Sequence, residues 1–134
     1  MSLAIDGTLD TNILLRFLLK DVQPQHQKAK KIVESSKIWH ISMLSIAEIV
    51  FVLTGIGFTR DEIKINIELL SNYSNLYMQR NIVLPALDLY ATHPAISFMD
   101  ACLAFESVAE YATPLWTFDR KLANQVPQAK LLTV

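Results

Sequence analysis

Apolar residues recur along the chain in two alternating patterns. Short apolar runs bounded by polar residues or glycine are typical of buried strands, and apolar residues three and four positions apart are typical of one helix face. The second pattern is clear at Ile13, Leu14, Phe17 and Leu18. The strands predicted in this way are residues 4–10, 37–42, 76–79, 115–118 and 129–134. The predicted helices are residues 12–20, 24–35, 45–54, 59–71, 83–92, 99–111 and 119–125.

Residues that favour helix starts support several of these boundaries. Pro24 suits the first turn of its helix. Ser45 and Glu48 have the spacing of a capping box, in which two side chains bind each other's backbone N–H groups. Strands that alternate with helices predict βαβ units, and therefore an α/β fold with a mainly parallel sheet.

Length and composition fit one folded domain. The 134 residues contain no repeat, low-complexity tract or linker, so we expect a single domain over residues 1–134, with residues 1–3 a candidate cloning remnant. Apolar residues make up 51% and charged residues 19%, which supports a packed core. No run of about 18 apolar residues predicts a membrane span, and the start of the chain lacks a secretory pattern.

Charge and cysteine content narrow the compartment and the partners. The net charge of −1 leaves no general attraction for nucleic acid, so any such function must depend on a local site. Cys102 is the one cysteine, which excludes an intramolecular disulfide and favours a reducing cytoplasm. Its apolar neighbours in "FMDACLAF" predict a buried, inert thiol.

Four acidic residues stand in unusual positions. Asp10 and Asp119 end the predicted strands 4–10 and 115–118, and Glu48 and Asp100 interrupt apolar helical stretches. Ligands bind beyond the carboxyl ends of strands in open parallel sheets. Helix capping explains each acid separately at about 1 kcal/mol, with Ser45 and Ser97 as the partners of Glu48 and Asp100. Both interpretations stay open for each residue.

A shared site for the four acids would need a cation. Two carboxylates 4 Å apart repel by about 4 kcal/mol at an effective dielectric constant near 20. Oxygen ligands favour Mg²⁺ or Mn²⁺. The three histidines, His26, His40 and His93, lack the spacing of zinc ligands.

Four segments resemble, in order, the motif blocks of PIN-domain ribonucleases, and most closely the VapC toxins of type II toxin–antitoxin pairs. These segments are "LDTNILLR", "SIAEIVFVL", "SFMDACLA" and "LWTFDRKLA". The resemblance implies a single-domain three-layer α/β/α sandwich, usually dimeric, that cleaves single-stranded RNA with a divalent metal. The first strand departs from the family, because Asp6 and Gly7 make it less apolar and leave its register open.

The resemblance also implies roles for individual residues. Asp10, Glu48, Asp100 and Asp119 would be the four metal-binding acids. Asn12 would support the site by hydrogen bonding, and Thr117 would be a polar helper beside Asp119. The implied partners are single-stranded RNA, a cognate antitoxin protein and a second copy of the chain.

Contacts with these partners have weaker signals. The basic residues considered for phosphate contact are Arg16, Lys20, Lys28, Lys31, Arg60, Arg120 and Lys121, each of which could equally lie on a solvated helix face. Trp39 and Trp116 could stack on bases, although we expect Trp116 to fill the core of its strand. The apolar segment "FVLTGIGF" is a candidate antitoxin groove, with a core or dimer contact as the alternative.

Two other functions remain at this stage. A non-enzymatic α/β partner-binding module would use the acids only as caps. An aspartyl-phosphate phosphatase would use Asp10 as nucleophile, but such enzymes carry a second aspartate two residues later, where this chain has Asn12.

Overall fold

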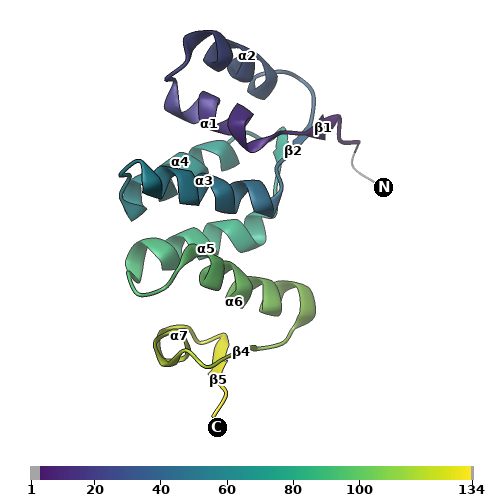
Figure 1. Ribbon diagram of the computed structural model, residues 1–134. Helices are drawn as coiled ribbons and strands as arrows, with labels where there is room; N and C mark the ends of the chain where they lie inside the picture. Colours follow the sequence, from purple (N-terminus) through teal and green to yellow (C-terminus); the bar gives the residue numbers. More distant parts are fainter. Residues whose placement is uncertain (1–3, 134) are drawn as a thin grey trace. The chain divides into compact units, whose positions relative to one another are not determined.

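The computed structural model describes residues 4–133, which form seven α-helices and five short β-strands (Figure 1). The proposed remnant at residues 1–3 lies outside the described residues. The helices are α1 (Thr11–Leu19), α2 (Gln23–Val33), α3 (Met43–Gly55), α4 (Arg60–Ser71), α5 (Arg80–Thr92), α6 (Phe98–Tyr111) and α7 (Arg120–Gln125). The strands are β1 (Gly7–Thr8), β2 (Trp39–His40), β3 (Leu76–Tyr77), β4 (Leu115–Thr117) and β5 (Ala129–Leu131).

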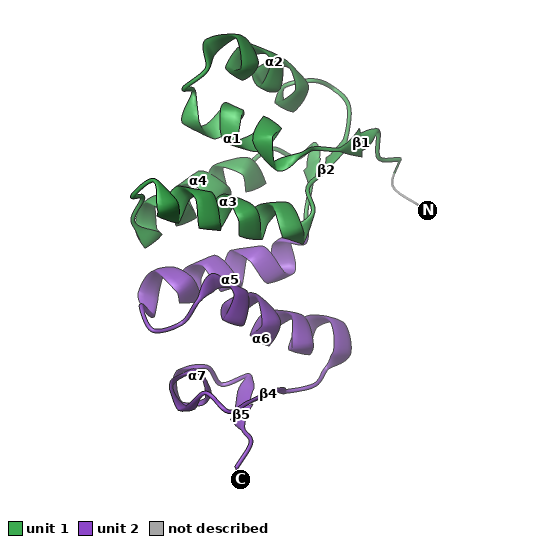
Figure 2. Ribbon diagram, in the orientation of Figure 1, with its two compact units in different colours: residues 1–78 green, residues 79–134 purple. Residues whose placement is uncertain are grey.

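The chain divides into two compact units, residues 1–78 and residues 79–134 (Figure 2). The first unit contains β1 to β3 and α1 to α4, and the second contains α5 to α7 with β4 and β5. The expectation of one domain over residues 1–134 stays a prediction.

Unit 1 is built on a three-stranded parallel sheet in the order β1-β2-β3, as the alternation of strands and helices predicts. Every strand is shorter than its predicted range, since only two or three residues of each strand pair with a neighbouring strand. At β1, the Asp6 carboxylate accepts a hydrogen bond from the Ile38 N–H (2.9 Å), so this acid extends the pairing with β2. Gly7 leaves room for the Trp39 ring, because a Cβ there would lie 3.0 Å from the ring and would push it aside by a few tenths of an ångström.

The helices of unit 1 bury an apolar core. Helix α1 packs against α2 and α3, and α3 packs against α4. Leu14, Ile46, Leu53, Ile63 and Leu70 are fully buried between them. Truncation of any of these side chains would leave a cavity and destabilise the unit. Their close packing therefore holds α1 and α3 in fixed positions within unit 1.

The predicted capping box of Ser45 and Glu48 is wrong. Helix α3 begins two residues earlier than predicted, at Met43, and its N-cap is Ser42, whose hydroxyl accepts the Leu44 N–H. Ser42 has an extended backbone directly after β2, which is the conformation that an N-cap needs. Ser45 therefore lies within the helix, and Glu48 is released from any capping role.

A complete capping box occurs instead at the start of α4. The Thr59 hydroxyl accepts the Glu62 N–H (3.2 Å), and the Glu62 carboxylate accepts the Thr59 N–H (2.9 Å). The bond from the Thr59 N–H to the carboxylate, with a side-chain hydrogen bond from Thr59 in addition, holds the pKa of Glu62 below its ordinary 4.5.

We expect Thr59→Ala to lower the free energy of unfolding by about 1 kcal/mol, because an N-cap is lost. The lowered pKa of Glu62 stabilises the fold above pH 4.5 and this contribution disappears as the pH falls through the lower value. Urea unfolding at pH 7 and pH 3 measures both effects. The variant should lose less stability on acidification than the parent; equal losses would contradict the account.

Unit 2 consists of a helix pair and a small sheet. Helices α5 and α6 pack together around Ile82, Leu87 and Ala104. Strands β4 and β5 are parallel and are joined through α7, with Trp116 opposite Lys130 in the register. The expectation that Trp116 fills the core is wrong, since its side chain is 59% exposed.

Cys102 is buried in α6, as its neighbours predict. Desolvation, with the charge of Glu106 in addition, raises the pKa of its thiol to about 12. At pH 8 only about one molecule in ten thousand then carries the reactive thiolate. We expect iodoacetamide to leave Cys102 unmodified in the native protein and to alkylate it in urea; mass spectrometry that finds fast native alkylation would contradict this.

None of the helices in the described part of the chain has both the length and the apolar character needed to cross a membrane.

Candidate metal centre

Asp10 lies where β1 passes into α1. Its predecessor Leu9 donates the last bond of the β1–β2 ladder, from its N–H to the His40 carbonyl oxygen (2.9 Å). Asp10 occupies the N-cap position of α1 with an extended backbone, yet its side chain makes no capping hydrogen bond. The carboxylate is exposed at the N-terminal, positive end of the helix dipole but accepts no hydrogen bond from the N–H groups of that helix. Capping therefore does not explain Asp10.

Glu48 lies in the second turn of α3, a helix that follows the carboxyl end of β2. Its side chain is exposed and has no hydrogen bond or ion pair with any residue of the described chain. Leu44 and Phe51, which are 80% and 79% exposed, flank it on the same helix face at i−4 and i+3. An unpaired acid thus stands between two exposed apolar side chains.

Both acids of unit 1 come from the same edge of its sheet. Asp10 follows the carboxyl end of β1, and the helix that carries Glu48 follows the carboxyl end of the adjacent, parallel β2. This is the edge at which open parallel sheets bind ligands.

Asp100 lies in the first turn of α6. Its N–H donates to the hydroxyl of Ser97 (3.1 Å), which is the N-cap of the helix, as the spacing of the two residues predicts. The reciprocal bond of a capping box is missing, because the Asp100 carboxylate does not accept the Ser97 N–H. Its half-buried carboxylate consequently keeps both oxygens for another ligand.

Asp119 is a true helix cap. Its Oδ1 accepts the Leu122 N–H at the start of α7 (3.1 Å), and its own N–H donates to the Thr117 hydroxyl (3.0 Å). The capping interpretation is confirmed for this residue alone. Its Oδ2 has no partner within the described residues, so one oxygen of Asp119 can still bind a cation.

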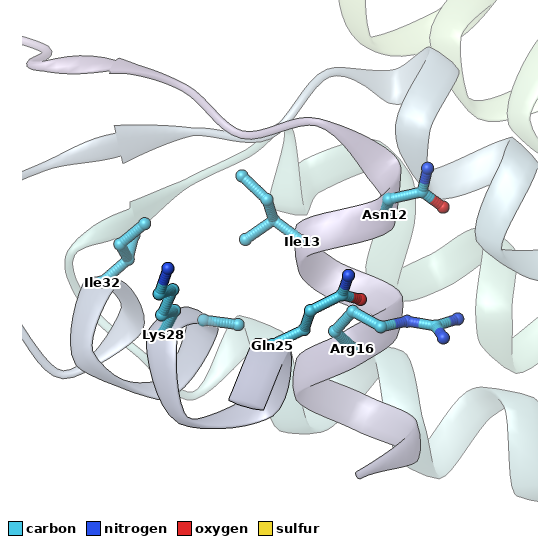
Figure 3. Close-up of a pocket in the computed structure, with 7 residues that line it drawn as sticks. Asn12, Ile13, Arg16, Gln25, Lys28 and Ile32 are labelled. Atoms are coloured by element: carbon cyan, nitrogen blue, oxygen red, sulfur yellow. The ribbon is translucent and has the colours of Figure 1, made fainter. Parts of the chain in front are cut away.

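Asn12 is exposed in the first turn of α1 and borders a cavity of about 570 Å³ between α1 and α2. Figure 3 shows that Asn12 and Arg16 extend from one side of α1, with their polar ends turned away from Ile32 and Lys28 of α2. Arg16 is already paired with Asp21 (3.0 Å), and its Nε is buried without a hydrogen-bond partner. It is therefore less suited to phosphate contact than the sequence suggests.

The three histidines have local partners. His26 bonds to the Arg16 carbonyl oxygen (3.1 Å), and His40 bonds to the Thr8 hydroxyl (3.0 Å). His93 lies beside the Thr92 hydroxyl (2.8 Å). Each imidazole therefore forms a local hydrogen bond with a neighbouring backbone or hydroxyl group.

Each unit supplies two of the four acids. The part of the chain that the structure describes, residues 4–133, contains no group of three or more His, Cys, Asp or Glu side chains placed to hold a metal. The binding of one cation by all four acids therefore stays a prediction. Sequence reasoning missed Leu44, whose spacing of four residues from Glu48 was the available signal, whereas Phe51 lies in the segment "FVLTGIGF" that the sequence had indicated.

A family model places these observations in context. The PIN domain model matches residues 8–126, a range that contains all four acids together with Asn12 and Thr117. No curated protein and no solved structure matches the chain. PIN domains are commonly nucleases and typically use divalent metals, which supports a hydrolase in general. The α/β class with parallel strands agrees with that match. The chain belongs to the PIN domain family.

Proposed function

We propose that the protein is a metal-dependent endoribonuclease that cleaves phosphodiester bonds of single-stranded RNA. Asp10, Glu48, Asp100 and Asp119 bind Mg²⁺ or Mn²⁺ in this proposal. The observation that carries it is that three of these carboxylates make no bond to the described chain and the fourth uses one oxygen. Unpaired acids within a PIN domain are best explained by a cation that binds them all.

The side chains divide the work in the following way. Asp10, Asp100 and Asp119 would hold the cation. Glu48 would ligate a second ion or orient the attacking water. A bound divalent cation supplies a water of lowered pKa and neutralises charge on the scissile phosphate. Asn12 supports the site by hydrogen bonding, and Thr117 fixes the backbone of Asp119 through their 3.0 Å bond.

Cleavage of a labelled single-stranded RNA tests this function. We expect products with Mg²⁺ or Mn²⁺, none with EDTA, and recovery when the metal is restored. Cleavage that persists at full rate in EDTA, or no cleavage with either metal, would reject the proposal.

The biological role that we propose is the toxin of a toxin–antitoxin pair in the cytoplasm, acting as a homodimer. Its support is the resemblance of the four motif blocks and the exposed apolar side chains around Glu48. An antitoxin that covers Leu44 and Phe51 would also cover the acid between them. Growth arrest on expression, relieved by co-expression of a cognate antitoxin, supports this role; harmless expression of active enzyme would reject it.

The competing function is a non-enzymatic partner-binding module. It is favoured by one observation, the cap that Asp119 provides for α7. It predicts no metal-dependent cleavage and unchanged behaviour when Asp10 is replaced, so the same RNA assay separates the two functions.

A further inference from the structure

The small sheet of unit 2 and the bend that follows it carry exposed aromatic and basic side chains. Trp116 lies in β4 (Leu115–Thr117), and Phe118 is the first residue after that strand. The two side chains are 59% and 67% exposed. Lys130 of β5 pairs with Trp116 in the register, and its Nζ lies 5.9 Å from the centre of the indole ring. The neighbouring strands and α7 are visible in Figure 1.

The chain segment that carries these side chains is basic although the protein is slightly negative. Residues 112–134 contain three basic side chains, Arg120, Lys121 and Lys130, and one acidic side chain, Asp119. Their net charge of +2 contrasts with −1 for the whole chain. Arg120 and Lys121 are exposed in the first turn of α7. A ligand that binds these side chains should therefore be anionic and should present flat apolar groups.

We propose that Trp116, Phe118 and Lys130 form a base-stacking surface for single-stranded RNA, with Arg120 and Lys121 binding its phosphates. The choice of RNA rests on the proposed function. Aromatic rings and cations together are how proteins hold single strands without reading sequence. Trp116 and Phe118 are two residues apart and both exposed, so each ring can receive its own base.

The position of the surface relates it to the proposed chemistry. Phe118 directly precedes Asp119, and Trp116 directly precedes Thr117, whose hydroxyl accepts the Asp119 N–H. A strand stacked on the two rings would be held beside a proposed metal ligand. These aromatic residues are positioning residues for the substrate and do not take part in bond cleavage.

Fluorescence of Trp116 tests the surface in the full chain. The protein has two tryptophans, and Trp39 donates its indole N–H to the Ile32 carbonyl oxygen (3.1 Å) in unit 1. In Trp39→Phe, all tryptophan emission comes from Trp116. Acrylamide should quench it readily, and a ten-nucleotide oligouridine should quench it saturably in EDTA. A ring that acrylamide cannot reach would overturn the proposal.

Anisotropy of a labelled oligouridine provides a second measurement that does not depend on Trp39→Phe. We expect Trp116→Leu and Phe118→Leu each to weaken binding about 5- to 150-fold. Lys130→Gln should lower the slope of log affinity against log salt by about one. Tyr111→Leu is the matched control, because Tyr111 is an exposed aromatic residue of α6 that belongs neither to this surface nor to the proposed metal site.

Affinities of Trp116→Leu and Phe118→Leu equal to the parent, or equal binding of duplex RNA, would overturn the proposal. The proposed nuclease function fails separately. RNA binding in EDTA without RNA cleavage in Mg²⁺ would reject the nuclease function and support the base-stacking surface. Metal-dependent cleavage together with unchanged RNA binding by the aromatic variants would support the nuclease function and reject the surface.

Discussion

Asp10→Asn should abolish RNA cleavage, with a fall in kcat on the order of a hundredfold or more, because a metal ligand loses its charge. Stability should change little, since the Asp10 side chain makes no capping bond to α1. Thermal unfolding should also separate the two proteins. Mn²⁺ at about a hundred times its dissociation constant stabilises a metal-binding protein by about 2.7 kcal/mol, and Asp10→Asn should lack most of this shift.

Asp61→Asn is the matched control for this substitution. Asp61 is also an exposed aspartate at the start of a helix, in the first turn of α4, and belongs to none of the proposed ligands. Its variant should cleave RNA like the parent and keep the stabilisation by Mn²⁺. Equal activity of Asp10→Asn and Asp61→Asn would remove Asp10 from the mechanism.

Asp119 should show two separable roles. Asparagine is as good an N-cap as aspartate, so Asp119→Asn should preserve stability, whereas Asp119→Ala should lose about 1 kcal/mol with the bond to the Leu122 N–H. Both variants should lose cleavage activity by on the order of a hundredfold, because both lack the carboxylate. Urea unfolding and the RNA assay measure the two roles independently.

The pair of Asp119 variants also distinguishes a metal ligand from a structural cap. If Asp119→Asn keeps full activity while Asp119→Ala loses stability, the residue is only a cap. That result would favour the partner-binding module over the nuclease.

The sequence predicts the order of elements well, because apolar spacing depends on local burial. All seven helices and five strands occur in the predicted order, and the parallel pairing follows from their alternation. The boundaries of helices are less predictable where two nearby residues could each act as the N-cap. Ser42 and Ser45 are both suitable caps, and only the end of β2 selects Ser42 by giving it an extended backbone.

The roles of the acids divide in a way that the sequence could not reveal. Asp10 and Asp119 both precede a helix, but only Asp119 turns its carboxylate toward the helix N–H groups. Spacing predicts that Ser97 and Asp100 interact, yet it cannot show that the bond runs in one direction only. These outcomes depend on side-chain rotamers, which are set by packing and not by sequence spacing.

Trp116 illustrates the opposite error. An aromatic residue in an apolar run predicts burial, and its neighbours Leu115 and Thr117 are indeed half-buried. Alternation along β4 turns Trp116 to the other face, where Lys130 of the adjacent strand lies over the ring. The sequence shows both residues but does not fix their register.

A crystal of the protein soaked in Mn²⁺ tests the central claim most directly, through the anomalous signal of the ion. The account predicts one or two peaks within bonding distance of carboxylate oxygens from Asp10, Glu48, Asp100 and Asp119 together. Manganese bound elsewhere, or these four side chains separated with no ion between them in a crystal of active protein, would contradict it.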